Sequence, residues 1–167
     1  DAMLTDVNFS SSQLGLADFT GSVIDDSGFV APGDESAARA SFHEAELSVT
    51  RFNDSILSRV YFGGARGLWT DFPGATLDQS IFDSVSFDQP DFTGTTFNVV
   101  WAFGADMRWA DFNDSIWNGG SVGVSKLVGA EFTGAHLEGL GLWLTDLDLS
   151  DFRNITINPD ATSSNDF

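Results

Sequence analysis

A large apolar residue recurs every five positions along most of this chain. From Phe42 to Ile157 the count in fives visits 24 positions, and 22 of them carry a large apolar side chain. The residue two places earlier is small in almost every unit, and the same pattern runs from Leu4 to Phe29. A period of five matches neither an α-helix, at 3.6, nor a strand, at two. The chain must therefore turn every five residues, as a coil of short extended segments joined by corners.

A second period, four times longer than the first, sets the size of the coil. Every fourth large position holds a Phe, and most of these Phe residues follow an acidic residue. The core Phe column is Phe52, Phe72, Phe92, Phe112, Phe132 and Phe152. The spacing predicts four sides of five residues per turn, with equivalent rings stacked at the strand spacing of about 4.8 Å.

Units such as Ala17-Asp18-Phe19-Thr20-Gly21 and Ala130-Glu131-Phe132-Thr133-Gly134 resemble the A(D/N)(L/F)xx unit of pentapeptide-repeat proteins. The resemblance covers nearly all of residues 2–158. It implies an all-β fold, a right-handed quadrilateral β-helix (β-solenoid) of about seven turns at one strand spacing each. We therefore expect a single solenoid domain over residues 1–158, followed by a polar C-terminal tail at 159–167.

The repeat is interrupted once, between Phe29 and Phe42. These two residues lie 13 apart, which is one unit of five and eight extra residues. The segment between them includes Pro32-Gly33-Asp34, which is typical of turns and loops. We expect an external loop at 31–38, and the alternative is two turns of the coil that together are seven residues short.

Charge and composition narrow the classes of function. The chain has 167 residues, of which 25 are acidic and seven basic, for a net charge of −18 with no Cys. Direct nucleic-acid binding is not expected, because phosphates need a basic footprint, and an anionic membrane surface would repel the chain as well. No stretch is long and apolar enough to span a membrane. We expect a soluble protein, either cytoplasmic or, after removal of a targeting peptide, extracytoplasmic.

Catalytic and metal-binding patterns are weak in this sequence. The two imidazoles, His43 and His136, are 93 residues apart and fall on different columns of the predicted coil. Asp146-x-Asp148 lacks the spacing of a known calcium loop. We predict that the protein is not an enzyme and that it binds no cofactor or metal.

One outward-facing set of residues is acidic. It comprises Asp71, Asp91, Asp111, Glu131 and Asp151, which we call the acidic column. The carboxylates of neighbouring turns should repel each other at strand spacing. The column either keeps a stack of β-coils soluble or makes a negatively charged rod that imitates duplex DNA.

Another outward-facing set is apolar, at positions that ordinarily meet solvent. This candidate apolar interface comprises Tyr61, Leu68, Trp69, Ile81, Trp101, Phe103, Trp109 and Trp143. It predicts an exposed patch on adjoining sides of the coil, for self-association as a homodimer or for a protein partner. The alternative is that some of these side chains fold over corners or under the loop. Trp117 falls in the core register instead.

The two surfaces support two hypotheses of function. The first is a protein–protein interaction scaffold that acts through its outer surface. The second follows from the resemblance, since some pentapeptide-repeat proteins bind type II topoisomerases such as DNA gyrase in place of duplex DNA. Those proteins tend to dimerise through a C-terminal helical cap, whereas residues 158–164 show no apolar helical period.

Overall fold

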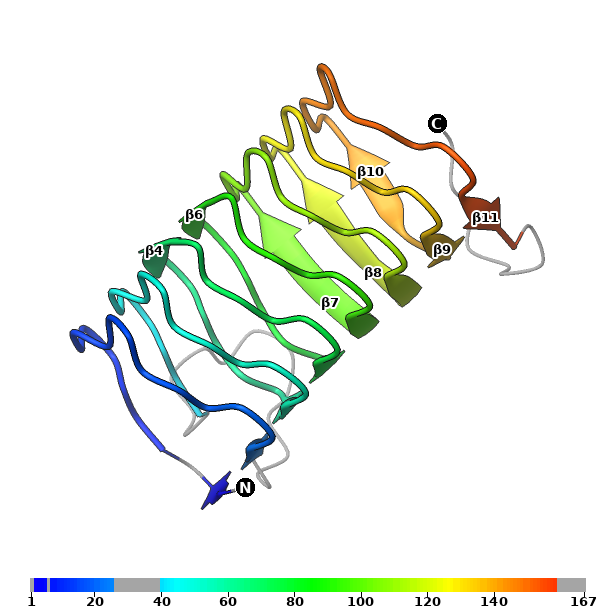
Figure 1. The fold of residues 1–167 in the computed structure, drawn as a ribbon. Helices are drawn as coiled ribbons and strands as arrows, with labels where there is room; N and C mark the ends of the chain where they lie inside the picture. The colour runs from blue at the N-terminus through cyan, green and yellow to red at the C-terminus, as the bar shows by residue number, and fades with distance from the viewer. Residues whose placement is uncertain (1, 6, 26–39, 159–167) are drawn as a thin grey trace.

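The computed structural model describes residues 2–5, 7–25 and 40–158, and these form an all-β coil of about seven turns (Figure 1). Parallel strands stack along the coil, each paired with the equivalent strand of the next turn. The main sheet runs in the order β1 (Met3–Thr5), β2 (Val23–Asp25), β3 (Ile56–Ser58), β5 (Thr76–Asp78), β7 (Thr96–Phe103), β8 (Ile116–Gly123), β9 (His136–Glu138) and β11 (Thr156–Ile157). β10 (Gly141–Trp143) pairs with β8, and β4 (Arg66–Leu68) pairs with β6 (Ser86–Asp88) in a second sheet.

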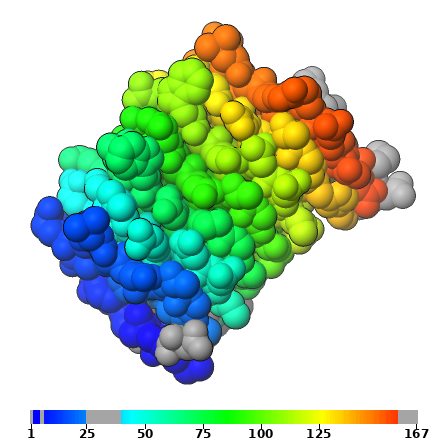
Figure 2. Space-filling view, in the orientation of Figure 1, coloured from blue at the N-terminus to red at the C-terminus, as the bar shows by residue number. Residues whose placement is uncertain are grey.

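The strand register confirms that one turn of the coil comprises four repeat units. Ile56 pairs with Thr76, Thr76 with Thr96, and Thr96 with Ile116. In the turn 40–59 we name the four sides A (40–44), B (45–49), C (50–54) and D (55–59), and the same names apply to the equivalent segments of the other turns. Figure 2 shows the turns packed against each other in sequence order, so each outer position forms a row along the rod.

The interior holds the repeated Leu and Phe side chains together with the small residues two places earlier. On side C, Phe72 and Phe92 are buried with ring centroids 4.9 Å apart, and Phe92 lies 5.0 Å from Phe112. These separations match the predicted stacking at strand spacing. Trp117 is buried as its register predicts, with its ring 3.8 Å from that of Phe97. The stacked apolar side chains form one continuous core.

Each side ends in a tight corner. The N–H of Ser55 donates to the carbonyl of Phe52, and the residue before the donor, Asp54, has a φ of 54°. A positive φ at the third residue is the geometry of a type II turn. The left-handed residue recurs every five positions, as at Arg59 and Gly64. The five-residue period is thus a short extended segment plus one left-handed corner residue. The corner at Arg59 is held differently from that at Asp54, because the N–H of Val60 donates to Ser80 Oγ in the next turn.

The single interruption differs from the expected one in its length. Asn8 pairs with Ser41 and Asp18 with Arg51, whereas a regular turn would pair them with Gly28 and Ala38, so the insertion is one repeat unit longer than expected. The next repeat position after Ile24 is the one that stacks on Phe9. The periodicity assigns this position to Phe29, but in the structure Phe42 occupies it. The direct pairing also leaves no room for the alternative of two shortened turns. The expected loop at 31–38, Phe29 itself and the tail at 159–167 lie outside the described residues.

Candidate interaction surfaces

The acidic column lies on side C, with one carboxylate in each of five successive turns. Asp71 pairs with Asp91, Asp91 with Asp111, and the ladder continues to Glu131 and Asp151. Four of the five are half-buried, and Glu131 is exposed. The same row begins with Asp18 and Arg51 in the first two turns, so only its N-terminal end is balanced by a basic neighbour in the ladder.

Burial and like charge act together on the middle of the acidic column. Burial raises the pKa of Asp111, and the neighbouring carboxylates of Asp91 and Glu131 raise it further, while the N–H of Asn113 opposes the shift. Burial followed by the charge of Asp91 also raises the pKa of Asp71. Among the described residues, no basic side chain forms an ion pair with Asp91 or Asp111. The middle of the column is therefore a row of uncompensated negative charge.

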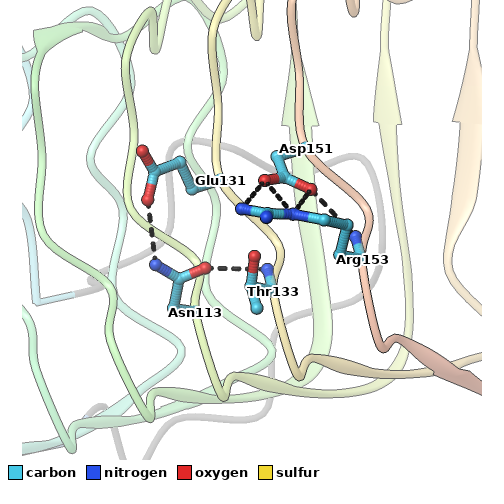
Figure 3. Close-up of polar contacts among 5 residues, drawn as sticks. All are labelled: Asn113, Glu131, Thr133, Asp151 and Arg153. Carbon is cyan, nitrogen blue, oxygen red and sulfur yellow. Dashed lines mark hydrogen bonds and ion pairs between the residues drawn. The ribbon is translucent and has the colours of Figure 1, made fainter.

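Polar contacts at the C-terminal end of side C are denser (Figure 3). Arg153 Nε donates to Asp151 Oδ2 at 2.7 Å, and its side chain holds the pKa of Asp151 below its usual value. Asn113 Nδ2 donates to Glu131 Oε2 at 3.1 Å, and Asn113 Oδ1 accepts the N–H of Thr133 at 2.7 Å. These contacts orient the carboxylates of the last turns. In the middle of the column, Asp91 accepts the N–H of Thr93 at 2.8 Å, whereas the equivalent residue after Asp71 is Pro73, which has no N–H to donate.

The candidate apolar interface divides between sides A and B. Six of its eight residues are exposed, and Tyr61 and Ile81 are half-buried. Trp101, Phe103 and Trp143 are 41%, 51% and 46% exposed on side A. Trp69 and Trp109 are 51% and 54% exposed at the corner between sides B and C. Large apolar side chains are thus exposed on sides A and B, at the outward positions of the five-residue unit.

Several of these rings lie against glycines of a neighbouring turn. A Cβ added at Gly129 would collide with the ring of Trp109, and one added at Gly123 would collide with the ring of Trp143. Trp143 Nε1 also donates to Ser121 Oγ at 2.8 Å, and the Trp143 ring lies 5.6 Å from that of Phe103. The rings are therefore held against the coil with one face toward solvent.

Sequence analysis did not identify the glycines under these rings. Gly129 lies one turn after Trp109 in its row, and Gly123 lies one turn before Trp143. An aromatic residue and a glycine one turn apart in the same row are the signal that reveals such a contact. Val124 and Leu144, in equivalent corner positions between sides A and B, extend the exposed apolar surface of side A.

The imidazoles and carboxylates form no compact cluster in the described part of the coil. His43 Nδ1 lies 2.6 Å from the carbonyl oxygen of Gly63 on side A, and His136 Nε2 lies 3.8 Å from Glu138 Oε2 on side D. Over residues 2–5, 7–25 and 40–158, no group of three or more His, Cys, Asp or Glu side chains is placed to hold a metal ion. Within the same ranges, no helix is long and apolar enough to cross a lipid bilayer.

The coil agrees with the resemblance to pentapeptide-repeat proteins. Four sides of five residues surround a core of Phe, Leu and small side chains, and the equivalent residues of successive turns pair in parallel. The resemblance is thereby confirmed at the level of the fold.

Comparisons with known proteins give matches among solved structures only. No family model and no curated protein matches the chain. A trypsin-treated form of QnrB1, a plasmid-mediated fluoroquinolone resistance protein, matches with a TM-score of 0.48 at 15% identity, over 94% of this chain and 82% of that one. The pentapeptide repeat protein Rfr23 of the cyanobacterium Cyanothece matches with a TM-score of 0.28 at 17% identity, over 93% and 91% of the two chains.

A third similar structure is HetL, a pentapeptide repeat protein involved in heterocyst differentiation regulation in the cyanobacterium Nostoc. It matches with a TM-score of 0.28 at 18% identity, over 96% of this chain and 88% of that one. These identities are too low to transfer a function from any of the three proteins to this chain.

Proposed function

We propose that this protein is a non-enzymatic scaffold that binds a protein partner through its outer surface. The observation that carries the proposal is the exposure of large aromatic side chains on sides A and B, among them Trp69, Trp101 and Trp109. Trp and Tyr are enriched where proteins bind proteins, because they bury much area at a small cost in conformational entropy. Contact with a partner would remove these ring faces from water.

The interior does not require these aromatic residues. One outer position of side A varies between Phe103, Gly123 and Trp143 in three successive turns. The inward positions of the large residues stay apolar instead. Small or polar residues fill the equivalent outer positions elsewhere, such as Asp83. The rings therefore contribute little to the core, and their presence is better explained by contact with another molecule.

The experiment is partner capture from a native cell extract with a triple variant of side A, Trp101→Ser, Phe103→Ser and Trp143→Ser. The control removes two exposed apolar residues from outer positions of side D, Ile56→Ser and Ile116→Ser. We expect a stoichiometric protein partner on the natural chain and on the control, and its loss from the side A variant. Equal capture by all three chains would contradict the proposal for side A.

A second candidate function is imitation of duplex DNA toward a type II topoisomerase such as DNA gyrase. The observation that favours it is the uninterrupted acidic column, in which the negative charges of Asp91 and Asp111 have no ion-pair partner among the described residues. Enzymes that bind DNA carry basic surfaces, and a row of carboxylates can occupy them.

A gyrase supercoiling assay, with and without a quinolone, tests this second function. Inhibition or drug protection should survive Trp101→Asp with Trp143→Asp and should be lost in the triple variant Asp71→Asn, Asp91→Asn and Asp111→Asn. The control, Asp78→Asn, Asp88→Asn and Asp148→Asn, makes the same change in net charge away from the column. No effect of the natural chain at micromolar concentration would exclude gyrase.

A further inference from the structure

One corner of the coil combines exposed apolar residues with the acidic column. At the corner between sides B and C, each of the five turns from residue 60 onward presents an outward residue, then an inward residue, then an acid: Trp69-Thr70-Asp71, Gln89-Pro90-Asp91, Trp109-Ala110-Asp111, Gly129-Ala130-Glu131 and Leu149-Ser150-Asp151. The turn before them has a base in the third place, in Val49-Thr50-Arg51. We call the outward row Trp69, Gln89, Trp109, Gly129 and Leu149 the B/C corner. The acidic column thus runs beside the B/C corner, two residues further along each turn.

The B/C corner carries apolar residues where the backbone disfavours them. Trp69, Trp109 and Leu149 have φ angles of 55°, 58° and 63°, a left-handed conformation that costs a residue with a Cβ roughly 1 kcal/mol. The corner between sides C and D has the same geometry, and its residues are those that tolerate it: Asp54, Gly74, Gly94, Asp114, Gly134 and Asn154. Val99, Val124 and Leu144, at the other two corners, also carry a Cβ at a left-handed φ, so the fold tolerates such residues but does not require Trp at the B/C corner.

The charge around the B/C corner selects the partner. On side B, the basic side chains of Arg108 and Lys126 lie 2.8 and 3.7 Å from carboxylate oxygens of the same residue, Asp106, which compensates part of their charge. On side C, the carboxylates of Asp91 and Asp111 have no such partner among the described residues. A second copy of this chain, with a net charge of −18, would be repelled, as would an anionic membrane. The complementary molecule is cationic on one flank and apolar beside it.

The spacing of the exposed residues fits a helix laid along the rod. Trp69, Trp109 and Leu149 are each two turns apart, which is roughly 10 Å at the strand spacing. Residues seven apart on an α-helix are separated by about 10.5 Å along its axis. Three apolar residues at this interval, with Lys or Arg on one flank, would contact the B/C corner and the acidic column together.

We propose that the B/C corner binds a basic amphipathic helix of a partner protein, with apolar residues seven apart. Trp69, Trp109 and Leu149 contact the apolar residues of the helix, and Asp71, Asp91 and Asp111 contact its basic flank. This inference rests on the proposed scaffold function and assigns the partner's chemistry to one part of the outer surface.

Fluorescence anisotropy with a labelled synthetic helix tests the inference on the full chain. The probe is a 21-residue peptide of three identical heptads with Leu at the apolar positions and Lys on one flank, and the control peptide has Glu in place of Lys. We expect the Lys peptide to bind, its affinity to fall with added salt, and the Glu peptide to show no binding. Equal binding of both peptides, or none of either, would overturn the inference.

Two double variants locate the peptide on the surface. Trp69→Ser with Trp109→Ser should weaken binding at least tenfold, while Trp101→Ser with Trp143→Ser, which removes two exposed rings from side A, should change it less than twofold. Asp91→Asn with Asp111→Asn should weaken binding and flatten its salt dependence, and Asp78→Asn with Glu138→Gln, which removes two charges from side D, should not. Circular dichroism checks that each variant is folded.

Other outcomes separate this inference from the proposed function. Equal weakening by both Trp pairs would show a non-specific apolar contact and would overturn the inference. Sedimentation showing a dimer that the Trp69→Ser, Trp109→Ser variant abolishes would do the same, because the corner would then bind a second copy. If the peptide fails to bind but the side A variant still loses a captured protein, the scaffold function stands and only the helix assignment falls.

Discussion

Two corners of the coil share a left-handed φ and differ in the side chains that they carry there. The corner between sides C and D holds only Gly, Asp or Asn from residue 54 to residue 154, the residues that accept a left-handed φ at the least cost. The B/C corner places Trp69, Trp109 and Leu149 in that same conformation and exposes them. The first corner follows the demands of the fold, and the second departs from them. The departure marks the surface on which a role outside the fold is to be sought.

The largest expected effect comes from filling the glycine beneath a ring of the B/C corner. Gly129→Ala adds a Cβ that collides with the Trp109 ring, and it also places Ala at a φ of 70°. We expect a loss in the free energy of unfolding of about 2–3 kcal/mol, measured by urea denaturation.

Gly94→Ala is the matched control for this change. Its φ of 64° gives nearly the same backbone strain, but a Cβ there meets nothing within 4 Å. We expect a loss of about 1–2 kcal/mol. Equal losses at the two sites would mean that the Trp109 ring does not pack on Gly129. The two corners would then differ only in the types of residue that they carry.

A smaller effect of opposite sign is expected at Leu149. This residue is 81% exposed with a φ of 63°, so Leu149→Gly relieves strain while removing little packing. Glycine has more conformational freedom in the unfolded chain, and this offsets part of the relieved strain. We therefore expect a net gain of about 0.5 kcal/mol in the free energy of unfolding. A clearly lower melting temperature of the variant would show that Leu149 stabilises the coil. That result would contradict the claim that the fold does not need Leu at this corner.

The acidic column lies on side C, between the two corners, and its middle should show a dependence on pH. Burial and then the carboxylates of Asp91 and Glu131 hold the pKa of Asp111 above its unfolded value. The stability linked to this group is therefore fully present below the unfolded pKa and is lost as pH rises through the folded pKa.

Asp111→Asn should accordingly stabilise the coil at neutral pH by a few tenths of a kcal/mol, at the scale of one like-charge pair. The gain should vanish at about pH 3, where the carboxyl is protonated in both states. Denaturation of both chains at the two pH values measures the difference. A gain that persists in acid would assign the effect to something other than charge.

The smallest effect is expected at the C-terminal end of the column. Hydrogen bonds from Arg153 hold the pKa of Asp151 below its usual value, so the linked stability is present above the unfolded pKa and is lost as pH falls through the folded pKa. The Arg153 side chain is largely solvated, so Arg153→Gln should leave the unfolding midpoint nearly unchanged. An NMR titration should instead show the pKa of Asp151 rising in the variant, and an unchanged pKa would refute the pairing.

The core and the exposure of the aromatic rows could be predicted from sequence, because inward and outward positions alternate in a fixed five-residue unit. Phe92 and Trp117 are buried and Trp69 is exposed for that reason alone. The position of Phe42 beside Phe9 could not be predicted, since the chain at the break can be divided between repeat and insertion in several ways. The pairing of neighbouring turns decides which residues belong to the repeat, and no local sequence pattern shows this pairing.

For the candidate site, too, the sequence predicts which residues form each row but not the contacts between their side chains. The acidic column and the apolar residues follow from the longer period, because residues one turn apart form a row. The seating of Trp109 on Gly129 and the compensation of Arg108 by Asp106 depend on side-chain conformations that the period leaves open. That the two corners share a left-handed φ, and that their residue types can therefore be compared, appears only when φ is known at each of them.

The most direct test of the account measures folding and binding on one variant, Trp69→Asn with Trp109→Asn. Asn tolerates the left-handed corner, so relief of strain should offset the lost ring contacts. We expect a melting temperature within about 5 °C of that of the natural chain and at least tenfold weaker binding of the Lys peptide. Retained binding, or a coil that no longer folds, would contradict the claim that the B/C corner serves a partner and not the fold.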